Sequence, residues 1–265
     1  MFTFLQASPN DGSSAEQHTI PPQAIHKFAV VIPVYNHESR LRAVVESAMS
    51  LRLPVYVIDD GSTDATPGIL KSIPGITVIS HSTNLGKGAA LMTGFTEAAR
   101  TADFAITIDA DGQHDPADAV HLMAPLQSGI HAIVIGRREN MLNDTRIKWT
   151  SRFGRKFSNF WVRMSGGPVL SDTQSGFRIY PIHEILGIKS VSRRFQFEVE
   201  IVVLAHWKSI PIVEVPVKVL YPSKQDRISH FRPFVDFWRN AGTFTMLIAM
   251  RILLPLKLRR RLIQK

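Results

Sequence analysis

The sequence predicts an α/β fold in which a mostly parallel, Rossmann-like sheet is flanked by helices. Short apolar runs rich in β-branched residues alternate with segments of helical spacing. The connections between them are short, as in doubly wound sheets. Polar clusters follow four of the apolar runs, and sheets of this class bind ligands outside the carboxyl ends of their strands. The fold class therefore also predicts one ligand-binding edge.

The first half of the chain alternates regularly between the two kinds of segment. The run at 28–34, FAVVIPV, is apolar throughout, which predicts a buried strand. Residues 38–50 then repeat apolar side chains at helical spacing. The elements expected next are a strand at 55–58, a helix capped by Ser62 or Asp64 and ending near 73–75, a strand at 76–79, a helix at 86–100, a strand at 104–108, a helix at 116–127 and a strand at 132–135.

The second half is less regular. Residues 145–164 carry basic side chains, no acidic ones, and aromatic residues at three- and four-residue spacing, which is typical of a basic amphipathic helix or of a helix with its aromatics in the core. We expect a turn and short strand at 172–180, a helix at 194–208, a strand at 212–220, and a further helix from about Pro233.

Composition divides the chain into three parts. Residues 1–26 are rich in Ser, Pro, Gly and Gln and predict a mobile arm without the features of a secretory signal. Residues 27–232 carry the α/β pattern, and residues 233–265 form an apolar and then basic segment. Lys and Arg number 31 against 22 Asp and Glu, a net charge of +9 that favours anionic partners. The absence of cysteine excludes disulfides and thiolate metal sites.

The C-terminal segment predicts attachment to an anionic membrane surface. No apolar run reaches the ~18 residues of a spanning helix, and Arg251 and Pro255 interrupt this one. Each basic side chain beside an anionic leaflet contributes about 1 kcal/mol. The basic residues concerned are Arg259, Arg260, Arg261 and Lys265. The alternative is a helix packed on the rest of the protein.

The stretch TIDADGQHDP predicts a metal site. Asp109 and Asp111 flank Ala110 directly after an apolar run, and carboxylates suit hard cations such as Mg²⁺ and Mn²⁺. Such a cation can neutralise a leaving diphosphate. The alternative is a polar loop in which Asp115 caps a helix that has Pro116 at its first position. That alternative explains Asp115 but leaves the other two aspartates without a role.

Other polar clusters allow two interpretations each. Asp59-Asp60-Gly61-Ser62 is a common turn sequence, and it could also contact a ribose or base. Tyr35 could stack on a base or close the core. Gly86-Lys87-Gly88 lacks the first glycine and the Ser or Thr of a Walker A loop. A glycine-rich helix start can still favour an anion, with Lys87 either binding it or solvated. Zinc-protease and nucleophile-elbow motifs are absent from the sequence.

Taken in order, these motifs resemble a known family. VVIPVYNHE, VIDDGSTDAT, NLGKGAAL, TIDADGQHDP, GRRE, DTQSGFRIY and FEVEI follow the pattern of family 2 inverting glycosyltransferases with the GT-A fold, over roughly residues 28–232. The branch that the sequence resembles is that of dolichol-phosphate mannosyltransferase-like enzymes, which load sugars onto polyprenyl phosphate. The resemblance implies a nucleotide-diphosphate sugar donor, a lipid acceptor and a peripheral position on the cytoplasmic face of a membrane.

The resemblance also implies roles for residues at matching positions. Nucleotide and sugar contacts are implied for Pro33, Tyr35, Asp59, Asp60, Asp109, Ala110, Asp111, Gln174, Ser175 and Gly176. Metal contacts are implied for Asp109, Asp111 and Gln113. Arg137 stands where the family has an arginine near the phosphates, and Arg152 resembles a contact to the acceptor phosphate. Lys87 completes the expected donor site.

Two departures from the family pattern concern the base and the acceptor. His37 stands where the family usually has Glu, so that either Glu38 takes this role by a small shift or the base contact differs. In Ser229-His230-Phe231, His230 occupies the place of a lysine of the polyprenyl-phosphate branch, and Arg227 is the candidate for the arginine of that branch. The second departure keeps another acceptor open.

The expected chemistry is attack on the anomeric carbon, with a cation on Asp111 stabilising the leaving diphosphate. A lipid phosphate is already nucleophilic and needs positioning by Arg137 and Arg152. A hydroxyl of a lipid, pigment or polysaccharide precursor needs a base. Glu198 and Glu200 are candidates, although a position on a helix surface is the simpler interpretation of both.

Two further function classes are less favoured. A nucleotidyltransferase also uses a parallel α/β sheet with Asp-bound Mg²⁺, but its glycine-rich first loop is replaced here by Pro33-Val34-Tyr35-Asn36. We expect no nucleic-acid partner, because the clustered aspartates would repel phosphates unless a metal intervened.

Overall fold

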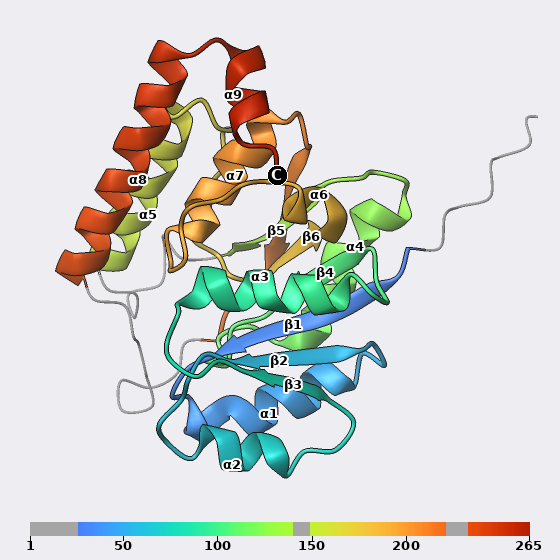
Figure 1. Ribbon diagram of the computed structural model, residues 1–265. Coiled ribbons are helices and arrows are strands. Elements are labelled where there is room, and N and C mark those ends of the chain that lie inside the picture. Colours follow the sequence, from blue (N-terminus) through green and yellow to red (C-terminus); the bar gives the residue numbers. More distant parts are fainter. Residues whose placement is uncertain (1–25, 140–148, 221–232) are drawn as a thin grey trace, which may run out of the picture.

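The computed structural model describes residues 26–139, 149–220 and 233–265, and its side chains are described from 153 and 237 onward in the last two ranges. Within these ranges the chain forms a sheet of seven strands in the order β3-β2-β1-β4-β6-β5-β7 (Figure 1). The strands are β1 (Phe28–Val34), β2 (Val55–Asp59), β3 (Thr77–Ser80), β4 (Phe104–Thr107), β5 (Ile133–Arg138), β6 (Arg178–Pro181) and β7 (Ile212–Val217).

Most strands run parallel, as predicted, and β6 is the exception. It lies antiparallel between β4 and β5, with Thr107 opposite Arg178 at the carboxyl end of β4. Because β6 runs in the opposite direction, it begins at the edge where its neighbours end. The segment that precedes β6 is therefore brought to the same edge as the polar residues that follow β1, β2 and β4.

Helices cover both faces of the sheet. They are α1 (Glu38–Met49), α2 (Thr66–Lys71), α3 (Lys87–Ala98), α4 (Ala119–Gln127), α5 (Trp149–Met164), α6 (Ile182–Leu186), α7 (Phe197–Trp207), α8 (Pro233–Leu253) and α9 (Leu256–Leu262). Figure 1 shows α3 on one face and α1 with α2 on the other. Alternate residues of β1 enter the two cores: Val31 packs in the one that includes Phe95, and Val30 in the one that includes Leu41.

Some element boundaries differ from the prediction. The helix expected at 116–127 begins as a 3-10 turn, η1 (Pro116–Asp118), and the predicted cap is confirmed because Asp115 accepts a hydrogen bond from the N–H of Ala117 at 3.0 Å. Capping by Ser62 is wrong, since its Oγ accepts instead from the N–H of Asn36. Asp64 accepts from the N–H of Thr66, the first residue of α2.

The C-terminal helices pack against the rest of the protein through one side. Ring centroids lie 5.2 Å apart between Phe157 of α5 and Phe237 of α8, and 6.4 Å apart between Trp161 and Phe244. Leu247 is fully buried. The two helices therefore run side by side in the same direction. Within the described residues, the longest helices fall short of the length and apolarity that crossing a membrane requires.

Candidate active site

Asp109 and Asp111 follow β4 at the carboxyl edge and differ in their electrostatic surroundings. Burial and, to a smaller extent, the charge of Asp109 together raise the pKa of Asp111 to about 6. The backbone N–H of Gln113 donates to Oδ1 of Asp111 at 2.9 Å. Burial acts in the same direction on Asp109, but the charge and hydrogen bond of Lys87, together with the nearby histidines, outweigh it and lower that pKa. Asp109 is thus compensated by a basic side chain, whereas Asp111 has no comparable partner among the described residues.

Lys87, at the start of α3, is the partner of Asp109. Its Nζ lies 2.6 Å from Oδ1 of Asp109 and 2.7 Å from Oε1 of Glu198. Burial alone would lower the pKa of this lysine, but the two carboxylates raise it above its ordinary value. The interpretation of Lys87 as a solvated side chain is wrong, because only 13% of its side chain is exposed. Lys87 remains a cation fixed between two anions.

The interpretation of Glu198 and Glu200 as carboxylates on a helix surface is also wrong. Both are buried in the first turn of α7, at 7% and 1% exposure. Glu198 is held by Lys87, and Glu200 accepts hydrogen bonds from the Oγ of Ser190 and from the N–H groups of Val191 and Ser192. The sequence gives an indication of this burial: α7 is apolar on all sides, FEVEIVVLAHW, and such helices lie inside a protein.

Gly176 makes the pairing of Lys87 with Asp109 possible. A Cβ built at this position would overlap Oδ2 of Asp109 and lie 2.7 Å from Nζ of Lys87. The carbonyl of Gly176 accepts a hydrogen bond from Oγ1 of Thr107 at 2.8 Å, which fixes the backbone against β4. A side chain at position 176 would therefore displace one of the two charged groups.

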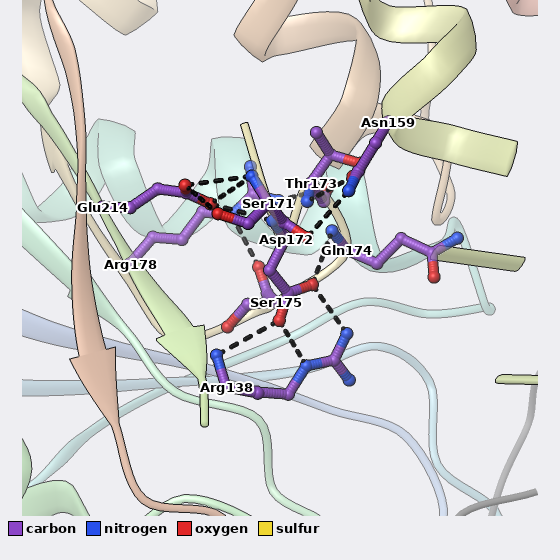
Figure 2. Close-up of polar contacts among 9 residues, drawn as sticks. All are labelled: Arg138, Asn159, Ser171, Asp172, Thr173, Gln174, Ser175, Arg178 and Glu214. Carbon is purple, nitrogen blue, oxygen red and sulfur yellow. Dashed lines mark hydrogen bonds and ion pairs between the residues drawn. The ribbon is translucent and has the colours of Figure 1, made fainter. Parts of the chain in front are cut away.

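The segment 171–176, which includes the predicted sugar-pocket residues Gln174, Ser175 and Gly176, is fixed from two sides by carboxylates (Figure 2). Asp172 accepts from Nε and Nη2 of Arg138 at 2.7 and 2.8 Å. The side chain of Glu214 on β7 accepts from the N–H groups of residues 171 and 172. Although burial raises the pKa of Asp172, the hydrogen bonds and charge of Arg138 lower it overall.

Arg178 holds the same segment from beneath. It is fully buried at the start of β6, and its guanidinium donates to the carbonyls of Thr173, Ser175 and Glu198 at 2.8, 2.6 and 2.9 Å. Asn159 of α5 completes the support by accepting from the N–H of Thr173. The loop is thus built on rigid elements, which leaves the half-exposed side chain of Gln174 at its surface.

Arg137 and Arg138 take different places at the end of β5. Successive strand residues face opposite sides. Arg138 binds Asp172, and its positive charge offsets a small part of the rise in the pKa of Asp111. Arg137 is half-buried at the preceding position and pairs across the ladder with Pro216. The structure therefore brings Arg138, which the sequence did not single out, to the acidic pair.

Asp60 organises the loop that carries Lys87. Its carboxylate accepts from the N–H groups of Leu85 and Gly86 at 2.9 and 2.7 Å and lies 2.7 Å from Nδ1 of His81. The same residue that was a candidate for ribose binding thus fixes the N-terminal end of α3. Asp59 accepts from the N–H of Ser62 through Oδ1.

The predicted base contacts lie around the end of β1. Pro33 is buried within the strand, and Tyr35 is half-buried directly after it. Glu38 is exposed, and its Oε2 accepts from the N–H of Ala65 at 2.9 Å. The charge of His37 contributes to lowering the pKa of Asp109, so this histidine faces the acidic pair.

Ala110 lies between the two aspartates, and Gln113 and His114 follow them in different environments. Ala110 is buried, whereas Gln113 is half-exposed beside Asp111. His114 is buried against the ring of Phe177, and burial lowers its pKa to about 4, so that it is neutral at pH 7. The side chain of Arg152 and the residues Arg227, Ser229 and His230 lie outside the described part of the chain.

Comparison with known proteins gives a consistent result. A family model described as glycosyl transferase family 2 matches residues 29–186. A UDP-N-acetylglucosamine–dolichyl-phosphate N-acetylglucosaminyltransferase of Methanococcus voltae is 29% identical over 213 residues, which cover 72% of this chain and 85% of that protein. An undecaprenyl-phosphate 4-deoxy-4-formamido-L-arabinose transferase of an Enterobacter species is 28% identical over 206 residues, covering 74% of this chain and 60% of that protein.

A solved structure shares the fold. Glucosyl-3-phosphoglycerate synthase of Mycobacterium tuberculosis, crystallised with Mn²⁺, UDP and glucosyl-3-phosphoglycerate, aligns with a TM-score of 0.63 and covers 88% of this chain and 82% of its own. Sequence identity in this alignment is 20%, so the likeness concerns the GT-A-like arrangement of the sheet and its helices.

Proposed function

The chain belongs to glycosyl transferase family 2, and we propose that it transfers a sugar, with inversion, from a nucleotide-diphosphate sugar to a polyprenyl phosphate. The names of the two relatives, which act on dolichyl phosphate and undecaprenyl phosphate, support this acceptor class. The observation that carries the proposal is that the carboxylates at the acidic edge differ in whether a basic side chain holds them. Asp111 is left for a cation, whereas Glu198, the candidate base, is held by Lys87 at 2.7 Å.

The residues around Asp111 suit Mg²⁺ or Mn²⁺ as cofactor. The described residues contain no cluster of three or more His, Asp or Glu side chains able to enclose a metal. Mg²⁺ is commonly held by one or two carboxylates together with substrate phosphates, so a complete protein cage is not needed. The raised pKa of Asp111 reflects a buried carboxylate beside a like charge, which a cation would relieve.

In this proposal Asp111 holds the cation, with Oδ2 of Asp109 and the side chain of Gln113 as further contacts. When bound, the cation neutralises charge on the leaving diphosphate. Lys87 keeps Asp109 ionised and oriented, and Arg138 keeps the loop of Asp172 in place beside it. These residues act by fixing the geometry of the donor rather than by transferring protons.

The acceptor step follows from the same arrangement. A phosphate oxygen of the lipid forms a bond to the anomeric carbon while the bond from that carbon to the diphosphate breaks, and the nucleoside diphosphate leaves. Since a phosphate is ionised at neutral pH, the step requires no general base. Arg137 and Arg152 remain the proposed contacts to the phosphates, and His230 remains a proposed contact near the acceptor.

The exposed side of α5 and α8 supports a peripheral position at a lipid surface. We call it the α5–α8 surface. Large apolar side chains are exposed along α5 and near both ends of α8, together with the basic residues Lys156 and Arg163 of α5. The apolar residues are Phe153, Phe160, Met164, Phe237, Trp238, Ile252 and Leu253. Apolar side chains beside basic ones suit the interface of an anionic membrane, which would keep the enzyme near its acceptor.

A donor screen tests the proposal. The purified protein is incubated with polyprenyl phosphate in detergent and with UDP-N-acetylglucosamine, UDP-glucose or GDP-mannose in turn, with Mg²⁺ or Mn²⁺. We expect one donor to yield a polyprenyl-phosphate sugar and free nucleoside diphosphate, and we expect a chelator to abolish the product. Sugar transfer that persists in the chelator would contradict the metal assignment, and release of inorganic diphosphate would indicate a nucleotidyltransferase.

A further inference from the structure

A cavity lies at the end of α7 that is remote from the acidic edge. Its volume is about 530 Å³, and it is bordered by the C-terminal end of α7, the residue Gly166 after α5, and the junction of α8 and α9. Glu198 stands in the first turn of α7 and Trp207 at its last residue. At 1.5 Å per residue, the cavity lies roughly 14 Å along the helix from the Lys87–Glu198 pair. Figure 1 shows α9 folded back toward this end of α7.

The cavity is lined by positive charge. Arg251, Arg259 and Arg260 border it together with His206, and none of the described residues that line it is acidic. Two of the three arginines are partly engaged by helix ends. Arg251 donates from Nη1 to the carbonyl of Met164 at 2.6 Å, and Arg260 donates from Nε to the carbonyl of Trp207. These carbonyls carry partial charges only, and no acidic side chain among the described lining residues neutralises the guanidinium groups.

Two N–H groups at the cavity have no acceptor among the described residues. They are Nε of Arg259 and Nε1 of Trp207, both buried. The guanidinium of Arg259 lies 4.7 Å from the centre of the Trp207 ring. Buried donors are nearly always paired in folded proteins. Burial and the neighbouring charge of Arg251 together lower the pKa of Arg259, as expected for cations that face each other without an anion.

Gly166 lies close against two of the donors that border the cavity. The point where its Cβ would stand lies 3.2 Å from Nε of Arg251 and 3.4 Å from Nε1 of Trp207. The backbone of Gly166 has a φ of 75°, which favours glycine. Nε of Arg251 and Nε1 of Trp207 therefore lie close to one point beside Gly166.

We propose that this cavity binds a phosphate group, which accepts hydrogen bonds from Trp207 and Arg259 and is neutralised by the guanidinium groups of Arg251 and Arg260. Planar guanidinium groups suit tetrahedral oxyanions because they present several donors in a fixed geometry. The phosphate belongs either to the headgroup of an anionic phospholipid or to a small phosphorylated solute. The site is separate from the acidic edge, and it does not depend on the proposed transfer reaction.

The indole N–H of Trp207 offers a direct readout. The chain has four tryptophans, and ¹⁵N labelling gives one indole resonance for each, with that of Trp207 assigned by Trp207→Phe. Inorganic phosphate or glycerol 3-phosphate is titrated at constant ionic strength, with chloride as the reference anion. We expect the Trp207 resonance to shift with saturation while the other three move little.

Two matched variants distinguish a defined phosphate site from general attraction of phosphate to a positively charged surface. Arg259→Gln removes a cavity-lining guanidinium, and Arg261→Gln removes the same charge from an exposed position on the same helix. We expect phosphate to bind at least tenfold more weakly to R259Q and unchanged to R261Q. If R259Q lowers the Tm, Arg259→Lys keeps the charge but still removes the Nε–H. Equal loss in R259Q and R261Q, or a Trp207 resonance that phosphate does not move, would overturn the proposal.

The two sources of phosphate are distinguished with vesicles. Flotation compares phosphatidylcholine vesicles with vesicles that also contain phosphatidic acid. Recovery on the anionic vesicles that falls in R259Q but not in R261Q assigns the site to a lipid headgroup. Saturable binding of glycerol 3-phosphate with equal vesicle recovery of both variants assigns it to a small solute. An absence of both kinds of binding in the wild-type protein contradicts the site.

Discussion

The two ends of helix α7 place charged side chains in opposite surroundings. At the first turn, Glu198 meets Lys87, which also meets Asp109, so that anions and cation alternate within 2.7 Å of one another. At the last turn, Arg259 and Arg260 surround Trp207 with no acidic residue among those that line the cavity. A buried charge that is paired within the chain fixes geometry, whereas a group of partly or fully exposed arginines without an acidic neighbour favours binding of an anion.

The acidic edge repeats this contrast on a smaller scale. Asp109 has a lysine, whereas Asp111 has a like charge beside it and a pKa raised to about 6 by burial and by Asp109. We interpret Asp109 as the residue that keeps the site in shape and Asp111 as the residue that receives the cation. The predictions below test this distinction, beginning with the largest effect.

Asp111→Asn tests the carboxylate to which we assign the cation. Because a carboxylate that holds the cation contributes several kcal/mol to stabilising the leaving group, we expect sugar transfer to fall by on the order of a thousandfold. Stability should rise by up to about 3 kcal/mol at pH 7, as measured by urea unfolding, because the pKa of Asp111 is raised by about two units. A variant that keeps more than a tenth of the activity would contradict the assignment.

The sign of the pH dependence follows from the raised pKa. Folded Asp111 binds a proton more tightly than unfolded Asp111, so its charge destabilises the fold increasingly as the pH rises from about 4 to about 6. The stability gained by Asp111→Asn should therefore vanish below about pH 4 and reach its full value above about pH 6. A gain that stays constant from pH 3 to pH 8 would show that the charge of Asp111 is not its cause.

Lys87→Met tests the ion pairs of Lys87 with Asp109 and Glu198. It leaves Asp109 and Glu198 as neighbouring buried anions, and breaking a buried ion pair from one side typically costs about 3–5 kcal/mol. We expect a loss of this size in urea unfolding, together with a loss of activity of about a hundredfold. The control is Lys71→Met on the exposed end of α2, for which we expect a change of less than about 0.5 kcal/mol.

Gly176→Ala disturbs the same pair by volume alone. The added Cβ would overlap Oδ2 of Asp109, so we expect a roughly tenfold to hundredfold fall in kcat/KM, since misplacement by about 1 Å can cost that much. Gly68→Ala is the control, because a Cβ there meets nothing within 4 Å. Wild-type kinetics in both variants would mean that the contact between Lys87 and Asp109 does not serve the reaction.

Trp238→Ala should have the smallest effect on the chemistry. Its side chain is 71% exposed on the α5–α8 surface. We expect unchanged turnover with acceptor in detergent and weaker flotation with anionic vesicles. Val120→Ala, exposed on α4 away from this surface, should leave flotation unaltered. If the two variants float equally well, the membrane contact must be sought on another surface.

The sequence identified the parts of the site that are adjacent in the chain. Asp109, Ala110 and Asp111 follow one apolar strand, and the alternating strands and helices predicted the edge at which they meet. It could not pair Lys87 with Glu198, which are 111 residues apart, nor Arg138 with Asp172, because such pairs depend on how β6 enters the sheet antiparallel. The surface position expected for Glu198 was wrong for a recognisable reason: its helix is apolar on every side.

The surroundings of the C-terminal basic residues could not be predicted from the sequence either. The sequence presented Arg259, Arg260 and Arg261 as one run of positive charge facing a membrane. In the structure Arg259 and Arg260 border the cavity, whereas Arg261 is exposed and is not among the residues that line it. The three arginines point in different directions because they lie on helix α9, which begins after Pro255, and successive helix positions differ by about 100°. Charge counting therefore predicts an anionic partner but cannot say which arginine meets it.

The most direct test of the account compares two acceptors that differ only in a phosphate. Polyprenyl phosphate and the matching polyprenol are offered with the active donor and Mg²⁺, and the lipid products are identified by mass spectrometry. Because Glu198 is held by Lys87 and a phosphate needs no base, we expect polyprenyl phosphate to receive a sugar through its phosphate and polyprenol to give no product. Efficient transfer to polyprenol would contradict it.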